Sequence, residues 1–223
     1  MKKILSFIAI AIIMTSCSSS DSGSSNFKPS LTRLDLASKV PANLQQNSPQ
    51  AFSQISQMEA YMNMGTLYMN NPVGKSASTN TWSSGGYTVT YSYELVGNQY
   101  QFSYTMTLNS VLYFTLTGWE NTAGTAGHWN YIMNTAVLGD PNGSNFNITF
   151  DWTKNSLGDY HFEMDFDMGT SGNLNYVSNI YHDFSGNYLY SSNSEQIYGA
   201  TWNSSGHGQF TNYMTNPPTV TNF

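Results

Sequence analysis

Apolar and polar residues alternate with a period of two along most of the chain from Trp82 onward. Aromatic or aliphatic residues occupy every second position over 87–95 and 100–108, with polar residues between them. The same alternation returns over 146–152 and 160–166. Successive side chains of a strand point to opposite faces of its sheet, so this pattern predicts strands with one apolar and one polar face.

The alternating segments are joined by short turns rich in Gly and Asn. About ten strands are predicted, over 87–95, 100–108, 111–119, 129–133, 146–152, 160–166, 173–182, 186–191, 195–202 and 208–214. Short links join antiparallel neighbours, which favours a meander. A sheet of this size with one apolar face has to curl or close on itself. We therefore expect a mainly β (α+β) fold, a curved half-barrel or barrel, with a β-sandwich as the alternative.

A helical pattern precedes the strands. Ser48 and Pro49 form a typical helix start, because serine caps the first turn and proline fits the first helical position. Apolar residues then recur at near-helical spacing, which predicts one main helix over about 49–69. We expect this helix to pack on the aromatic face of the sheet. The expected arrangement resembles periplasmic lipoprotein carriers and lipid-binding half-barrels in architecture.

The first seventeen residues have the pattern of an export signal. Two lysines precede an apolar run over residues 4–14, which is too short to span a bilayer. Small residues then lead to Cys17, the only cysteine of the chain. The segment 14–17 resembles the lipobox of bacterial lipoprotein signal peptides. The resemblance implies that the signal peptide, 1–16, is removed and that Cys17 carries the lipid; an ordinary secretory signal is the alternative.

The residues after Cys17 predict the organisation of the mature chain. Residues 17–29 are interpreted as the lipidated cysteine and a flexible tether, because 18–26 contain no apolar residue. A single β-rich domain is expected over 30–223, helical over 30–70 and with strands over 82–214. Position 19 lacks the aspartate that marks inner-membrane retention in the enterobacterial scheme, which favours the outer membrane. The periplasmic and the surface face both stay open.

The distribution of charged residues argues against nucleic acid and anionic membrane surfaces as partners. Charged residues are only 9% of the chain, whereas Asn, Ser and Thr together number 77 of the 223 residues. Residues 81–223 contain one basic residue, Lys154, and ten acidic residues, a formal charge of −9. Nucleic-acid binding needs basic residues that neutralise phosphates, so it is excluded, and anionic lipid headgroups would repel this segment.

Candidate catalytic or metal chemistry is sparse. The chain contains no GxSxG, HExxH, Walker or GxGxxG motif. Its densest group of titratable residues is His161, Glu163, Asp165 and Asp167, all expected on one face of one strand. Calcium favours several oxygen ligands, so this group is a candidate for a calcium site. The alternative is a solvated strand face, because residues two apart on a strand lie too far from each other for a compact cage.

Tryptophans are the other candidates for ligand binding. Exposed indole rings beside Asn and Asp are suited to gripping sugar rings, and Trp82, Trp119, Trp129 and Trp202 are the candidates for this role. Most of the five tryptophans, at least three, are expected in the core instead, because the sheet has to bury its aromatic face.

Three functions are compatible with the sequence, and none of them is enzymatic or requires a cofactor. The first is a lipid-anchored binding protein of the cell envelope that grips a glycan or another neutral polar ligand. The second is a half-barrel carrier or chaperone for acyl chains or apolar peptides. The third is an accessory subunit that docks on an outer-membrane protein. The first would need several tryptophans exposed on a rim. A lined, empty cavity between helix and sheet would favour the second, and a filled core with a flat, sizeable apolar patch would favour the third.

Overall fold

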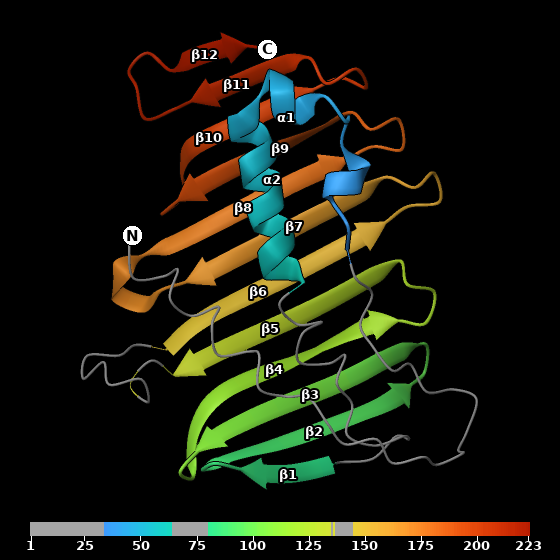
Figure 1. Ribbon diagram of the computed structural model, residues 1–223, viewed down its shortest axis with the longest axis vertical. Coiled ribbons are helices and arrows are strands. Elements are labelled where there is room, and N and C mark those ends of the chain that lie inside the picture. Colours follow the sequence, from blue (N-terminus) through green and yellow to red (C-terminus); the bar gives the residue numbers. More distant parts are fainter. Residues whose placement is uncertain (1–33, 64–79, 135, 137–144) are drawn as a thin grey trace.

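The computed structural model describes residues 34–63, 80–134, 136 and 145–223. Figure 1 shows that these residues form a broad antiparallel sheet with helices on one face. The helical segments are η2 (Ala37–Lys39), α1 (Leu44–Asn47), α2 (Pro49–Met62) and η4 (Gly169–Ser171). The strands are β1 (Asn80–Ser84), β2 (Tyr87–Val96), β3 (Gln99–Leu108), β4 (Val111–Asn121), β5 (Ala126–Asn134), β6 (Asn145–Lys154), β7 (Tyr160–Asp167), β8 (Asn173–Ile180), β9 (Gly186–Ser192), β10 (Glu195–Trp202), β11 (Gly208–Asn212) and β12 (Thr219–Asn222).

The sheet is a meander, as the short turns predicted. Each strand of the described residues pairs with the next in the chain, in the order β1 to β12. No pairing among these residues joins β1 to β12, so the sheet is open and not a closed barrel. The mainly β fold with one main helix is confirmed. The two strands beyond the predicted ten, β1 and β12, are short edge strands in which the alternation is weak.

The helix α2 begins where the sequence predicted but is shorter. The Ser48 hydroxyl accepts a hydrogen bond from the Ala51 amide at 3.4 Å, and Pro49 is the first helical residue. The expectation that the helix continues to about residue 69 was wrong, because α2 ends at Met62. The carboxamide of Asn63 instead bonds the backbone amide and carbonyl of Leu34, at 3.1 and 2.7 Å. Among the described residues, no helix is long and apolar enough to cross a membrane.

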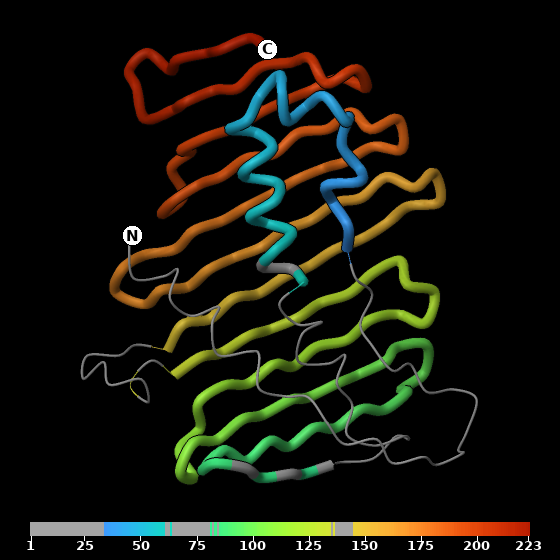
Figure 2. The backbone as a smooth tube through the Cα atoms, in the orientation of Figure 1, coloured from blue at the N-terminus to red at the C-terminus, as the bar shows by residue number. Residues whose placement is uncertain are grey.

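One face of the sheet, here called the inner face, packs against α2 and the segment before it. Ala51, Ile55 and Met58 of α2 are buried in one hydrophobic cluster with the aromatic residues of the strands. In Figures 1 and 2 the helix runs across the strands from β10 to β6. Two carboxamides hold its N-terminal end, because Asn43 and Asn47 donate to the carbonyls of the β10–β11 turn at 2.7 and 2.9 Å. The opposite side of the sheet is the outer face.

Aromatic rings line the inner face in continuous stacks. Tyr176, Tyr190, Tyr198 and Phe210 come from four successive strands, with ring centroids 4.4, 6.2 and 5.7 Å apart. Offset stacking at such distances adds to the stabilisation that burial alone provides. The strands are therefore joined by side-chain packing as well as by the backbone ladder.

Each buried tryptophan of the inner face lies opposite a glycine of the neighbouring strand. The three pairs are Trp129 with Gly118, Trp152 with Gly127, and Trp202 with Gly186. A Cβ atom added to Gly127 would lie 2.5 Å from the Trp152 indole, and one added to Gly186 would lie 2.5 Å from the Trp202 indole. The indole ring therefore limits Gly127 to glycine, and at Gly186 the ring does so together with the Asn179 carbonyl oxygen. At Gly118 a Cβ atom would instead meet the His128 carbonyl oxygen and the Phe102 ring.

Gly186→Ala should lower the free energy of unfolding by about 1–3 kcal/mol, because the new methyl group would lie 2.5 Å from both the Trp202 ring and the Asn179 carbonyl oxygen. The matched control is Gly199→Ala, since a Cβ atom there meets nothing closer than 3.4 Å. The control should be neutral or stabilising by up to about 1 kcal/mol, through the reduced entropy of the unfolded chain. Urea unfolding of both variants measures the difference, and equal midpoints would contradict the packing argument.

Candidate functional site

The strand register arranges outer-face side chains in rows that run across the sheet. One row, here called the central row, takes one residue from each of β3 to β7. Its members are Gln101, Trp119, His128, Asp151 and Glu163. Neighbouring strands lie about 4.8 Å apart, so these five side chains form a contiguous line. A second row beside it is made of Ser103, Thr117, Asn130, Thr149 and Asp165.

Trp119 is the large aromatic residue of the central row. The alternation of β4 buries Phe114 and Leu116 on the inner face and therefore turns Trp119 outward. Its side chain is half-buried between Gln101 of β3 and His128 of β5. An indole ring in this place gives the polar outer face a flat apolar surface with hydrogen-bonding groups on both sides.

A hydrogen-bonded pair follows Trp119 in the row. His128 Nδ1 lies 2.8 Å from Asp151 Oδ1, and their side chains are 34% and 56% exposed. This contact orients the imidazole on the open surface beside the indole ring. Glu163 stands next to Asp151 on β7, so the row presents an imidazole and two carboxylates to solvent.

The four candidate metal ligands lie on the outer side of β7, as their alternation predicted, but they do not converge. His161 Nδ1 lies 2.8 Å from Asn179 Oδ1, and Asp165 accepts a hydrogen bond from Asn175 at 2.7 Å. Asp167 accepts one from the Gly169 amide at 2.8 Å. Three of the groups thus contact three different neighbours, and Glu163 belongs to the central row. In the described part of the chain, no three His, Cys, Asp or Glu side chains are placed to hold a metal ion.

The tryptophan candidates divide between the two faces. Trp129 and Trp202 lie in the core and are 0% and 4% exposed, so the prediction that they bind a sugar at the surface was wrong. Their rings fill the inner face, and the Trp202 indole nitrogen donates to the Phe184 carbonyl at 2.9 Å. With Trp152, three tryptophans are buried, as expected. Trp119 alone is placed on the outer face, whereas the side chain of Trp82, like all of Cys17, lies outside the described residues.

The companions of Trp119 were not predicted from the sequence. Gln101, His128 and Asp151 lie 18, 9 and 32 positions from Trp119 in the chain, and only the register of three hairpins brings them to one row. Their polar positions in alternating segments predicted that they lie on the outer face, but not that they lie in one row. Tyr213 was also missed, although it follows Gln209 and Thr211 at the outward positions.

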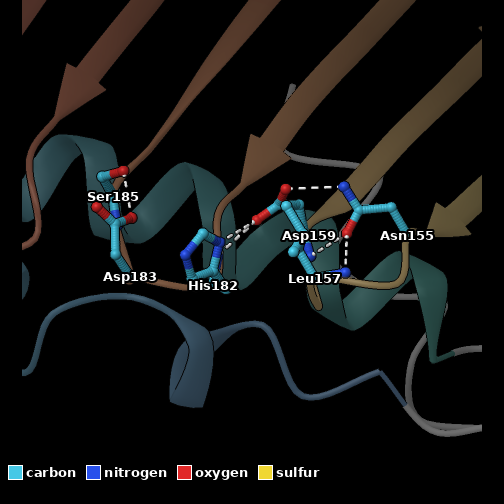
Figure 3. Close-up of polar contacts among 6 residues, drawn as sticks. All are labelled: Asn155, Leu157, Asp159, His182, Asp183 and Ser185. Atoms are coloured by element: carbon cyan, nitrogen blue, oxygen red, sulfur yellow. Dashed lines mark hydrogen bonds and ion pairs between the residues drawn. The ribbon is translucent and has the colours of Figure 1, made fainter.

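Two turns at one end of the sheet are joined by a second polar cluster (Figure 3). Asp159 Oδ1 accepts the His182 amide and lies 2.8 Å from His182 Nδ1, while Asn155 donates to Asp159 Oδ2 at 2.8 Å. These hydrogen bonds, that from Asn155 above all, lower the pKa of Asp159 to about 2. The Ser185 hydroxyl and amide likewise lower the pKa of Asp183. The cluster connects the β6–β7 and β8–β9 turns, and it lies apart from the central row.

Comparisons of the chain with models of protein families, with curated proteins and with solved structures found no match.

The Asp159 contacts predict a loss of stability in acid. A pKa of about 2 in the folded chain lies below that of an unfolded aspartate, so the unfolded chain takes up the proton first as the pH falls from about 4 to 2. Asp159→Asn should therefore flatten the fall in melting temperature between pH 5 and pH 2. Thermal unfolding followed by circular dichroism measures this. His161→Ala is the control, because His161 contacts Asn179 and not Asp159; a wild-type slope in Asp159→Asn would refute the assignment.

Proposed function

We propose that this protein is a non-enzymatic binding protein of the cell envelope, anchored by lipid at Cys17, whose outer face binds a neutral glycan. The observation that carries the proposal is the central row. It places the Trp119 ring between Gln101 and the His128–Asp151 pair on an open surface.

The chemistry of the central row suits a sugar. A pyranose ring has an apolar face of C–H groups and a rim of hydroxyls, so it is best held by a flat aromatic ring with hydrogen-bonding groups beside it. Carboxylates such as Asp151 and Glu163 accept strong, charge-assisted hydrogen bonds from hydroxyls. All these side chains stand on paired strands, which reduces the entropy that binding would cost.

Charge supports a neutral ligand over an anionic one. The segment 81–223 has a formal charge of −9, and its one basic residue, Lys154, lies over the Tyr160 ring at 5.2 Å. Phosphates and acidic sugars would therefore be repelled. The same distribution argues against catalysis, since carboxylates on an open strand face have no closed site in which to act.

A carrier of apolar ligands is the second candidate, favoured by polar atoms in the core. The indole nitrogens of Trp129 and Trp152 and the hydroxyl of Tyr188 are buried without a hydrogen-bond partner in the described structure. Buried donors of this kind are costly, and a bound ligand with acceptor groups would satisfy them. Thermal-shift measurements with fatty acids separate the two candidates, because only the carrier should be stabilised by them.

The lipid anchor is tested by Cys17→Ser. Three acyl chains hold a protein on a bilayer almost irreversibly, whereas a chain without them has no such attachment. The variant should move from the membrane fraction to the soluble fraction of the cell. Ser16→Ala is the control and should stay with the membrane. Unchanged fractionation of Cys17→Ser would exclude the anchor without affecting the binding proposal.

Glycan binding is tested by Trp119→Ala on an array of neutral and acidic oligosaccharides. The wild-type chain should bind one class of neutral glycan, and the variant should bind it about tenfold more weakly, the equivalent of roughly 1.4 kcal/mol. Trp119→Phe should retain most of the affinity because it keeps an aromatic ring. Tyr181→Ala serves as control, because it removes an exposed aromatic residue from the β8–β9 turn, which is not part of the central row. Equal binding by Trp119→Ala would reject the central row as the site.

A further inference from the structure

The line of the central row continues across three more strands. Glu163 of β7 pairs with Val177 of β8, which pairs with Leu189 of β9, and Leu189 pairs with Gly199 of β10. Val177 and Leu189 are half-buried on the outer face. The polar section of the row, from His128 to Glu163, is therefore followed by an apolar section.

A second aromatic ring lies at the far end of this line. A Cβ atom on Gly199 would be 3.4 Å from Tyr213 Cε2 and 3.5 Å from Leu189 Cδ1, so the Tyr213 ring lies beside the outer surface of Gly199. The Tyr213 amide donates to the Ile197 carbonyl at 3.0 Å, just beyond the end of β11. This bond holds the backbone of Tyr213 next to β10, and the ring is half-buried on the outer face.

The distance between the two aromatic rings is too long for one sugar. Trp119 stands on β4 and Gly199 on β10, which are six strand spacings apart, or about 29 Å. The described side chains between them include Asp151 and Glu163 but no lysine or arginine. The line is continuous in register from Trp119 to Gly199, and it contains no basic residue other than His128.

We propose that the ligand of the outer face is an extended, unbranched, neutral glycan chain, which lies across the strands from Trp119 to Tyr213. This inference rests on the proposed function and adds the class of ligand. The two rings contact sugar faces at the two ends, and the His128–Asp151 pair and Glu163 bond hydroxyls between them. A site for a single terminal sugar would need only one ring and a closed pocket around it.

Calorimetry with the full-length chain in detergent tests the proposal. The probes are cello-, laminari-, malto- and manno-oligosaccharides of two to eight units. In the series that binds, affinity should rise with chain length until the chain reaches both rings. Tyr213→Ala should weaken binding of the eight-unit chain about tenfold and leave the two-unit sugar almost unchanged. Trp119→Ala should weaken both.

Control variants separate this proposal from the proposed function. Tyr181→Ala should bind like the wild-type chain, and Val177→Lys, which obstructs the line between the rings, should weaken only long chains even if Tyr213→Ala fails to fold. Suppose that Trp119→Ala weakens binding but that affinity depends neither on the length of the glycan nor on Tyr213 and Val177. This result would overturn the extended chain and leave the proposed function intact. Failure of all four series to bind would overturn the extended chain, and failure of the wild-type chain to bind any neutral glycan on the array would overturn the proposed function as well.

Discussion

Large aromatic side chains on one face of an open sheet have to be packed without a second sheet to cover them. Here α2 covers part of that face, and within the sheet Trp129, Trp152 and Trp202 each lie opposite a glycine of the next strand. A slip of one residue in register would put these rings on the outer face and the Ser and Thr residues in the core. At Gly127 and Gly186 the indole ring fills the space of the missing side chain, so this fit favours the observed register, on which the rest of the structure depends.

The same register determines the arrangement of the side chains on the outer face. Since Trp119 alternates with the buried Leu116, and His128 with the buried Trp129, packing on the inner face determines which polar side chains become neighbours outside. The central row is thus held in place by a core that does not contact it. A site built in this way is rigid on the strands that carry it, which is what recognition of a repeating ligand requires under the proposed function.

The faces of the strands could be predicted from the sequence, whereas the rows could not. Alternation alone separates Trp119, which shares its parity with Thr115 and Thr117, from Trp129, which shares its parity with Tyr131, so the faces of these two tryptophans were predictable. The rows depend on how hairpins align, including irregularities at Met106/Thr107 and Gln196/Tyr198. The end of α2 was unpredictable for a similar reason, because Asn63 bonds Leu34, 29 positions earlier.

The unusual composition has a physical connection with the proposed ligand. A chain with 9% charged residues keeps its outer face hydrated through hydroxyls and carboxamides, which donate and accept hydrogen bonds equally well. Such groups can exchange water for sugar hydroxyls without the desolvation cost of an unpaired charge. Two of the carboxylates on this face already have a hydrogen-bonding partner, since Asp151 contacts His128 and Asp165 contacts Asn175. The scarcity of basic residues, which argues against nucleic acid and phosphate as ligands, therefore goes together with an outer face of hydroxyls and carboxamides that suits the proposed long, neutral chain.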